Sequence, residues 1–418
     1  MVKTPEELYQ EREKRINDAI QLRVPDRVPF WFQDISFFPA KYTGTTSQTL
    51  MYDDDVFVAA YKKALTDFEP DMYFNPGHAL HTPGDALEMI DSKQVKIPGR
   101  EISPYHTFQF IEGEYMKAEE YDVLLNDPTG YTISTYLPRV LGAMAPLATL
   151  PPLTGLLLGY FGLPLISVFA IPEVSSAFES FYKAGQAIQR HNSAVASLNQ
   201  ELKALGFPLA CGGITLAPFD VLSDTLRGMR GLMLDMYRQP DKVLAAIGKI
   251  LPMLIGLGVS GARMSGTLRV FVPLHRGADG FMSLEQFETF YWPGLKRLLL
   301  ALIDEGITPC PFFEGDYTSR LKYLAELPKG KVLGLFDATD MFKAKEILGD
   351  TMCISGMMPL SLLQVGTPQK IKDYAKKLID VVGKGGGYIM GPRSAMDECE
   401  PKLVRVWVDF TKEYGVYR

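Results

Sequence analysis

Apolar and polar positions alternate along most of this chain in two distinct ways. Short runs rich in Val, Ile, Leu and Phe, each followed by turn or polar residues, are typical of buried strands. Eight such runs are predicted as strands, at 27–32, 71–75, 207–214, 268–275, 308–313, 331–337, 352–357 and 387–391. The longer amphipathic stretches between them predict helices at 56–67, 174–205, 220–257, 283–304, 318–327, 341–348, 368–382 and 398–414.

Strands that alternate with helices favour a parallel sheet, and eight of them favour a closed (β/α)8 TIM barrel. A doubly wound open sheet is the alternative. The alternation fails over about 90–172, where "KQVKIPGREISPYHTFQFIEGEYMKAEEYD" predicts a β-hairpin and the start of a polar helix. We therefore expect a single barrel domain over 1–418, with an insertion at about 90–172 that follows the second strand.

The last part of this insertion, residues 140–172, contains no charged residue, and its length would permit a bilayer span. Pro146, Pro151, Pro152 and Pro164 interrupt it, and a broken backbone in lipid leaves polar groups unpaired. The prolines favour a buried segment or an apolar wall, which could serve as a subunit interface or as a lid over a ligand pocket. No membrane partner is expected, and a homodimer is allowed.

Composition narrows the function classes. With 47% apolar and 22% charged residues the chain is ordinary for a globular protein, and its net charge of −6 offers no general attraction to nucleic acid. Its four cysteines lie far apart without a CxxC pair, and "MVKTPEELYQEREKR" at the start does not resemble a leader. These features predict a reduced, cytoplasmic protein.

In a barrel, functional groups lie at the C-terminal ends of the strands. Those ends carry Trp31, Gln33, Asp34, Asn75, His78, His275, Arg276, Glu314, Asp316, Asp337, Asp340, Met357 and Arg393. Side chains alternate along a strand, so Phe312 and Glu314 share one direction, and Glu314 is expected at the mouth above Phe312. A carboxylate there is costly unless it meets a metal, a cation or a proton.

Each of these residues also has a structural interpretation. His275 could be a hydrogen-bonded structural histidine, and Glu314 could pair with a basic residue of the following helix. Asp337 and Asp340 could cap the next helix, and for Asp340 capping is the favoured role. The aromatic residues around Trp31 could be core rather than a pocket for an aromatic ligand.

Several segments resemble a known superfamily. They are "QLRVPDRVPFWF…KYTG" near the start, "APFDVLSDTLRGMRGLMLDMYRQPDKV" at 217–243, "SLEQFETFYWPGLKRLLLALIDEGITP" at 283–309 and "ISGMMPLSLLQVGTPQKIKDYAKKLID" at 354–380, followed by "GGGYIMGP". Together they resemble the uroporphyrinogen decarboxylase superfamily, above all its corrinoid-dependent methyltransferases. The resemblance implies a (β/α)8 barrel, a corrinoid (cobalamin) carried by a partner corrinoid protein, and allows zinc.

The chain departs from two patterns of that superfamily. The decarboxylases carry an arginine-rich "RQAGRY" after the first strand, whereas this chain reads "FWFQDISFFPAKY", so porphyrinogen decarboxylation is not expected. The branch that methylates coenzyme M holds zinc with a His-x-Cys-Gly motif and a later cysteine. The matching positions here are Phe312, Glu314 and Ser394, so a zinc-thiolate site is not expected.

The resemblance therefore implies a demethylating enzyme of the O-demethylase type. Such an enzyme moves a methyl group from a small donor, here a phenyl methyl ether, to cob(I)alamin. We expect Glu314, His275 and Asp337 to be catalytic, with Glu314 and His275 holding a metal or a proton at the ether oxygen. The expected donor contacts are Trp31, Gln33, Asn75, His78, Phe312, Met357 and Arg393.

Three other functions stay open. A metal-free transferase for a quaternary amine or sulfonium donor would need only an aromatic cage, because such donors leave as neutral molecules. The second open function is a methylcobalamin:thiol methyltransferase. The third is a non-catalytic protein that binds a corrinoid or a tetrapyrrole.

Overall fold

A computed structural model describes residues 3–33, 37–78 and 82–417 of the chain. Each of the eight predicted strand runs contains a short strand. These strands are β1 (Trp31–Phe32), β2 (Met72–Tyr73), β5 (Gly213–Ile214), β6 (Arg269–Leu274), β7 (Thr308–Phe313), β8 (Leu333–Phe336), β9 (Cys353–Ser355) and β10 (Tyr388–Ile389). Most are shorter than the apolar runs that contain them.

The eight strands are parallel and form two sheets, one of β1 and β2 and the other in the order β10-β9-β8-β7-β6-β5. Parallel bridges join the two sheets on both sides, between Phe30 and Met390 and between Tyr73 and Leu209. Pro29 and Pro208 stand beside these bridges and have no N–H with which to extend the ladder. The expected mixed α/β architecture is confirmed, and strands that are consecutive in the chain lie next to one another.

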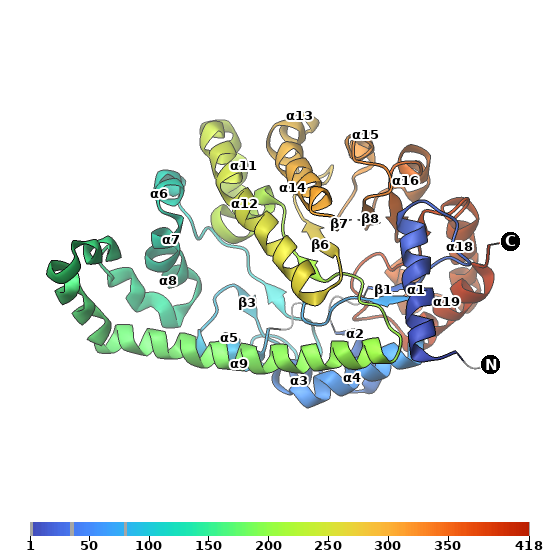
Figure 1. Ribbon diagram of the computed structural model, residues 1–418, viewed down its shortest axis with the longest axis horizontal. Helices are drawn as coiled ribbons and strands as arrows, with labels where there is room; N and C mark the ends of the chain where they lie inside the picture. The colour runs from blue at the N-terminus through green and yellow to red at the C-terminus, as the bar shows by residue number, and fades with distance from the viewer. Residues whose placement is uncertain (1–2, 34–36, 79–81, 418) are drawn as a thin grey trace.

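Helices surround the strands in Figure 1. The larger ones are α4 (Asp54–Phe68), α9 (Pro172–Ala204), α11 (Gly228–Arg238), α12 (Pro240–Ser265), α14 (Trp292–Asp304), α16 (Met341–Leu348), α18 (Pro368–Val381) and α19 (Pro401–Tyr414). The first helix, α1 (Pro5–Ile20), places Ile16, Ala19 and Ile20 among the side chains enclosed by the strands. Asp340 accepts hydrogen bonds from the backbone N–H groups of Phe342 and Lys343, so the capping role predicted for it is confirmed.

Shorter helices complete the chain around the strands. They are α2 (Phe38–Thr43), α3 (Ser47–Tyr52), α10 (Pro218–Val221), α13 (Leu284–Gln286), α15 (Leu321–Leu324) and α17 (Leu360–Val365). The single helix predicted over 220–257 is wrong. The chain there forms α10, a π-helical turn over 222–227, α11 and then α12, which begins at Pro240. Proline is favoured in the first turn of a helix because no partner is needed for its missing N–H, so Pro240 starts a new helix.

The strands alternate between an inner and an outer apolar cluster. Cys310 and Phe312 of β7 pack inside with Trp31, whereas Phe313 belongs to the larger cluster between strands and helices. The shared direction predicted for Phe312 and Glu314 agrees with this arrangement. Trp31 is 0% exposed, so the aromatic residue at the end of the first strand is part of the core.

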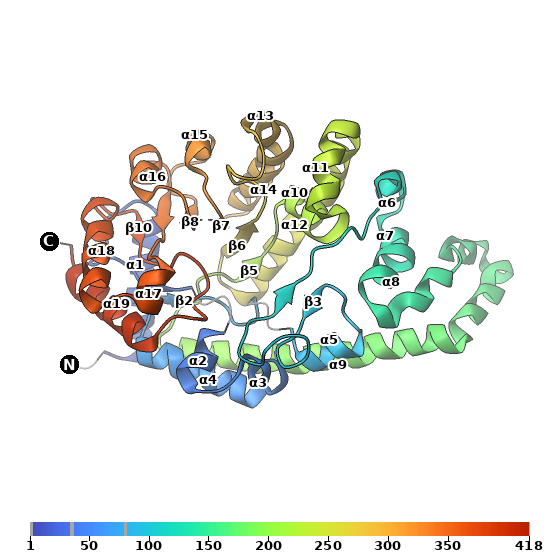
Figure 2. The same ribbon diagram turned by 180° about the vertical axis from the view of Figure 1, so that it is seen from behind.

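The segment between β2 and β5 holds the residues that do not fit the alternation. It contains α5 (Gly84–Met89), β3 (Val95–Lys96) and β4 (Gln109–Phe110), α6 (Tyr121–Asn126), α7 (Pro128–Tyr131), α8 (Leu137–Val140), and the 3-10 helices η3 (Gly142–Thr149) and η4 (Leu153–Ala170). Strands β3 and β4 pair antiparallel, where the sequence predicts a hairpin. The chain returns to the strands through α9, and Figures 1 and 2 both show α6 to α8 beyond the strands, toward the far end of α9.

Burial of residues 140–172 within the chain, one of the two roles expected for them, is wrong for most of the segment, whereas a role as an apolar wall at a subunit interface stays a prediction. In η4 only Gly162 is buried, and the side chains of Leu157 and Phe161 are 86% and 83% exposed. The reason is the length of α9: its 33 residues, at about 1.5 Å each, carry the segment away from the strands. Met144 and Leu147 of η3 do pack against the start of α9. In both views the segment lies too far from the strand ends to be a lid over them.

Candidate active site

A line of three ionisable side chains lies at the C-terminal ends of β6 and β7. His275 follows β6 directly and Glu314 follows β7. Glu314 Oε1 lies 3.5 Å from His275 Nε2, and on the other side of the ring His275 Nδ1 hydrogen-bonds to Asp224. The order is Asp224, His275, Glu314, with Asp224 supplied by the helical turn after β5. The structure therefore brings together two of the three predicted catalytic residues, His275 and Glu314, and adds Asp224 as a third member of the line.

A third carboxylate, Asp220, anchors the end of β6. It is fully buried, and its two oxygens accept hydrogen bonds from the backbone N–H groups of His275 at 2.9 Å and Arg276 at 3.1 Å. The hydroxyl of Tyr291 donates to it at 2.8 Å. Sequence reasoning missed Asp220 and Asp224 as site residues, although their spacing of four residues places both acids on one helix face.

The turn after β7 holds Glu314 in place. Gly315 has a φ of 88°, a left-handed conformation that side chains other than glycine's rarely adopt. Its N–H donates to Asp337 at 3.0 Å, and the Nε of Arg393 donates to the other oxygen of Asp337 at 2.6 Å. Asp337 is thus engaged in positioning the Glu314 turn.

The surroundings of Glu314 and His275 raise the pKa of both side chains. Burial raises the pKa of Glu314 to about 7, although the charge of His275 opposes the shift. Burial alone would lower the pKa of His275, but the hydrogen bond to Asp224 and the charges of Asp220 and Glu314 outweigh it and raise the pKa to about 9. The pair can therefore hold one proton or two near neutral pH. The Glu314 side chain is still 39% exposed, so a ligand at the strand ends can reach it.

Replacing Asp224 by Asn should lower the pKa of His275 from about 9 toward its ordinary value of 6.5, because the ring would lose its charged hydrogen-bond partner. NMR titration of the histidine ring protons, with His275→Gln to assign the signal, measures this. Asp127→Asn, in the insertion, is the matched control. A pKa that stays near 9 in Asp224→Asn would contradict the assignment of Asp224 as its cause.

The other predicted residues lie in different surroundings. Gln33 and Phe312 are each 1% exposed, and Trp31 lies with Phe312 inside the ring of strands. Met357 packs partly buried against the core. Asp34 lies outside the described residues, and Asp316 accepts from Thr318 at the turn before α15.

Asn75 and His78 line a separate cavity of about 480 Å³, bordered by residues of α9 and α12. Asn75 accepts a hydrogen bond from Asn199 of α9, and burial lowers the pKa of His78 to about 4. The structure thus does not place these two with His275 and Glu314. Contact with the donor stays a prediction for all seven residues for which it was expected: Trp31, Gln33, Asn75, His78, Phe312, Met357 and Arg393.

A zinc site does not fit the side chains at the mouth. Zinc held by protein takes at least three side-chain ligands. Among the described residues, no three side chains of His, Cys, Asp or Glu are grouped so that they could hold a metal ion. Glu314 and His275 offer one carboxylate oxygen and one ring nitrogen, and Asp220 is occupied by its own donors. We therefore derive no step through a metal.

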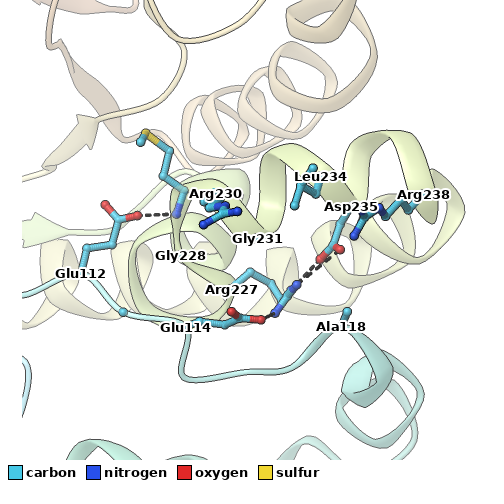
Figure 3. A pocket seen from close by; sticks show the side chains of 12 residues that line it. Glu112, Glu114, Ala118, Arg227, Gly228, Arg230, Gly231, Leu234, Asp235 and Arg238 are labelled. Carbon is cyan, nitrogen blue, oxygen red and sulfur yellow. Dashed lines mark hydrogen bonds and ion pairs between the residues drawn. The ribbon is translucent and has the colours of Figure 1, made fainter.

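A second polar cavity, of about 520 Å³, lies where α11 meets the loop after β4 (Figure 3). Arg227 crosses it and pairs with Glu114 at 2.7 Å and with Asp235. Arg276, next to His275, pairs with Glu112 of the same loop at 2.6 Å and with Asp224. The insertion is thereby tied to the candidate site by ion pairs, which sequence reasoning did not find because the paired residues lie more than 100 positions apart.

Comparison with known proteins supports the fold and shows the family of the chain. A methyltransferase from Methanosarcina mazei has a similar fold, with a TM-score of 0.61 over 96% of this chain and 98% of the other, at 12% sequence identity. The family model described as uroporphyrinogen decarboxylase (URO-D) matches residues 173–414. Fold and site thus define an α/β protein with parallel strands and a carboxylate-histidine site at their C-terminal ends. The chain belongs to the uroporphyrinogen decarboxylase family.

Curated relatives share part of this sequence. The uroporphyrinogen decarboxylase of Syntrophotalea carbinolica is 27% identical over 197 residues, which is 47% of this chain and 55% of the relative. That of Chlorobium phaeovibrioides is 29% identical over 137 residues, 32% of this chain and 38% of the relative. The matches span about half the length of these relatives or less.

Proposed function

We propose that this protein is a corrinoid-dependent methyltransferase, built on a closed (β/α)8 barrel, which moves a methyl group from a phenyl methyl ether to cob(I)alamin on a partner corrinoid protein. The observation that carries the proposal is the Asp224-His275-Glu314 line at the strand ends, in which the pKa of the reachable carboxyl is about 7. The fold shared with a structure described as a methyltransferase supports the same class. All four cysteines are buried, which suits a cytoplasmic location, where thiols stay reduced.

An ether donor poses a leaving-group problem that this site can solve. Cob(I)alamin on the partner protein would supply the nucleophile that takes the methyl group. As the C–O bond breaks, its electron pair stays on the oxygen, and the protonated carboxyl of Glu314 gives its proton to that oxygen, so the phenol leaves neutral. His275, held by Asp224 and charged below about pH 9, stabilises the carboxylate that Glu314 becomes.

The competing functions fit the site less well. Decarboxylation of a porphyrinogen would call for an arginine-rich segment just after the first strand, and residues 30–42 contain no arginine. A quaternary amine would call for exposed aromatic faces, yet Trp31 and Phe312 are 0% and 1% exposed. Thiol activation by zinc would call for the histidine and the cysteine of the coenzyme M branch, and the resemblance implies Phe312 and Glu314 at those positions.

The test is anaerobic methyl transfer followed by visible spectroscopy. Purified protein is mixed with chemically reduced cob(I)alamin, and guaiacol, a betaine and methyl-coenzyme M are added in separate reactions. We expect methylcob(III)alamin to form with the aryl ether. Formation with the betaine alone would favour the transferase for quaternary amines. Binding of cobalamin without turnover of any donor would favour a binding protein.

The rate of ether demethylation should fall as the pH rises through about 7. The neutral carboxyl of Glu314 is the proton donor; it is present below its pKa of about 7 and lost above it. Initial rates measured between pH 5.5 and 9.5 at saturating donor test this. If the rate instead stays constant to pH 8 and falls only near pH 9, the donor is His275, whose pKa is about 9.

A further inference from the structure

The end of the insertion exposes a continuous apolar surface, which we call the apolar tip. It comprises Leu157, Leu158, Tyr160, Phe161, Leu163 and Ile166 of η4, each more than half exposed. We propose that the apolar tip inserts into the outer layer of a phospholipid bilayer and holds the protein peripherally on a membrane surface. This function is independent of the proposed methyl transfer and replaces the sequence-based expectation of no membrane partner.

The exposure of the tip is far from ordinary for a soluble surface. Leu157, Tyr160 and Phe161 are 86%, 82% and 83% exposed. Soluble proteins expose single apolar residues commonly, but contiguous apolar patches mark an interaction site. Only 6% of η4 is buried, although the helix is apolar enough to enter a membrane. The other helix of that kind, α12, packs against strands β5 and β6.

The shape and chemistry of the tip favour lipid over a protein partner. Figures 1 and 2 show the segment before α9 projecting at one end of the molecule rather than forming a groove or a flat face. Gly159, with a φ of 60°, bends η4 next to Tyr160 and Phe161. The centroids of these two rings lie 5.8 Å apart. No charged residue occurs from 140 to 172, so the tip itself offers no ion pair to a protein partner, whereas insertion into lipid needs none.

The expected depth of insertion is shallow. Pro164 and the bend at Gly159 prevent a straight helix, and a broken backbone cannot cross the hydrocarbon core alone. Tyrosine prefers the level of the lipid headgroups, and leucine and phenylalanine the acyl boundary just below them. The tip therefore lies on the membrane rather than spanning it.

The charges around the tip predict which lipids it binds. Glu173 and Glu179 follow it in α9, and Lys183 is paired with Glu179 at 2.6 Å. No basic residue occurs from 140 to 182, so this stretch holds no cluster of positive charge that would attract anionic headgroups. Binding should thus occur on neutral lipid and change little with salt.

Flotation with phosphatidylcholine vesicles tests the proposal with the full chain. We expect the wild type to float with the vesicles at both 0.1 M and about 0.5 M salt. The higher concentration screens attraction between exposed charges, so binding there comes from apolar contact. The double variant Leu157→Glu/Phe161→Glu should lose about tenfold or more of its vesicle-bound fraction. Val365→Glu, at an isolated residue that is 85% exposed, adds the same kind of charge elsewhere and should bind as the wild type does. Circular dichroism confirms that each variant is folded.

A fluorescent reporter gives a second readout. The three native tryptophans are at most 6% exposed, so Tyr160→Trp adds the single exposed indole. Its emission should shift to the blue on vesicles and be quenched by brominated lipid. A wild type that does not float, together with an indole that does not respond, would overturn the proposal. If light scattering then shows a dimer that the double variant converts to a monomer, the tip is an interface with a second copy instead.

Discussion

Replacing Glu314 by Gln is expected to lower kcat for ether demethylation by about 100-fold or more, the range for loss of a general acid. The amide keeps the size of the side chain and its place above Phe312, but it cannot give a proton to the leaving oxygen. KM for the donor should change little, because the proton is needed only as the C–O bond breaks. Initial rates against donor concentration, with cob(I)alamin in excess, separate the two constants.

Two comparisons make this result specific. Glu305→Gln removes a carboxyl at the end of α14, where the chain enters β7 rather than leaves it, and should leave kcat unchanged. In Glu314→Gln the decline of the rate through about pH 7 should also disappear. Equal losses in kcat and in donor affinity would show that Glu314 binds the donor and is not the acid.

Replacing Asp71 by Ala should lower the free energy of unfolding by about 3–5 kcal/mol, the cost of leaving a buried charge without its partner. Asp71 is 0% exposed and accepts hydrogen bonds from Arg15 at 2.6 Å, from Arg27 at 2.7 Å and from the backbone N–H of Phe30 at 2.7 Å. Without it, Arg15, which is 3% exposed, would lose one of its carboxylate partners inside the protein. Urea denaturation followed by circular dichroism measures the change.

Asp122→Ala is the control for this prediction, because Asp122 is 64% exposed and its pair with Lys242 is worth at most about 1 kcal/mol. The contribution of Asp71 should also depend on pH. Its two arginines hold its pKa below the ordinary value of 3.8 despite burial, so the stabilisation is present at neutral pH and is lost as the pH falls below that value. A change below 1 kcal/mol in Asp71→Ala would show that the arginines find other partners.

Much of the local structure was decided by the sequence alone. The apolar runs located eight strands, and the alternation along β7 placed Phe312 inside and Glu314 at the mouth. Asp340 was recognised as a helix cap. These features depend on residues a few positions apart, whose periodicity and turn chemistry are written directly in the chain.

Only the tertiary structure decided which side chains meet and which face water. Asp224 and Glu314 flank His275 because packing brings the helical turn after β5 next to the ends of β6 and β7, and Asn75 and His78 line another cavity together with residues of α9 and α12. The charge-free segment at 140–172 has the composition of a core, yet the length of α9 carries it into solvent. An apolar composition shows only that burial of a segment would be favourable. Whether the segment is buried depends on contacts between residues far apart in the chain.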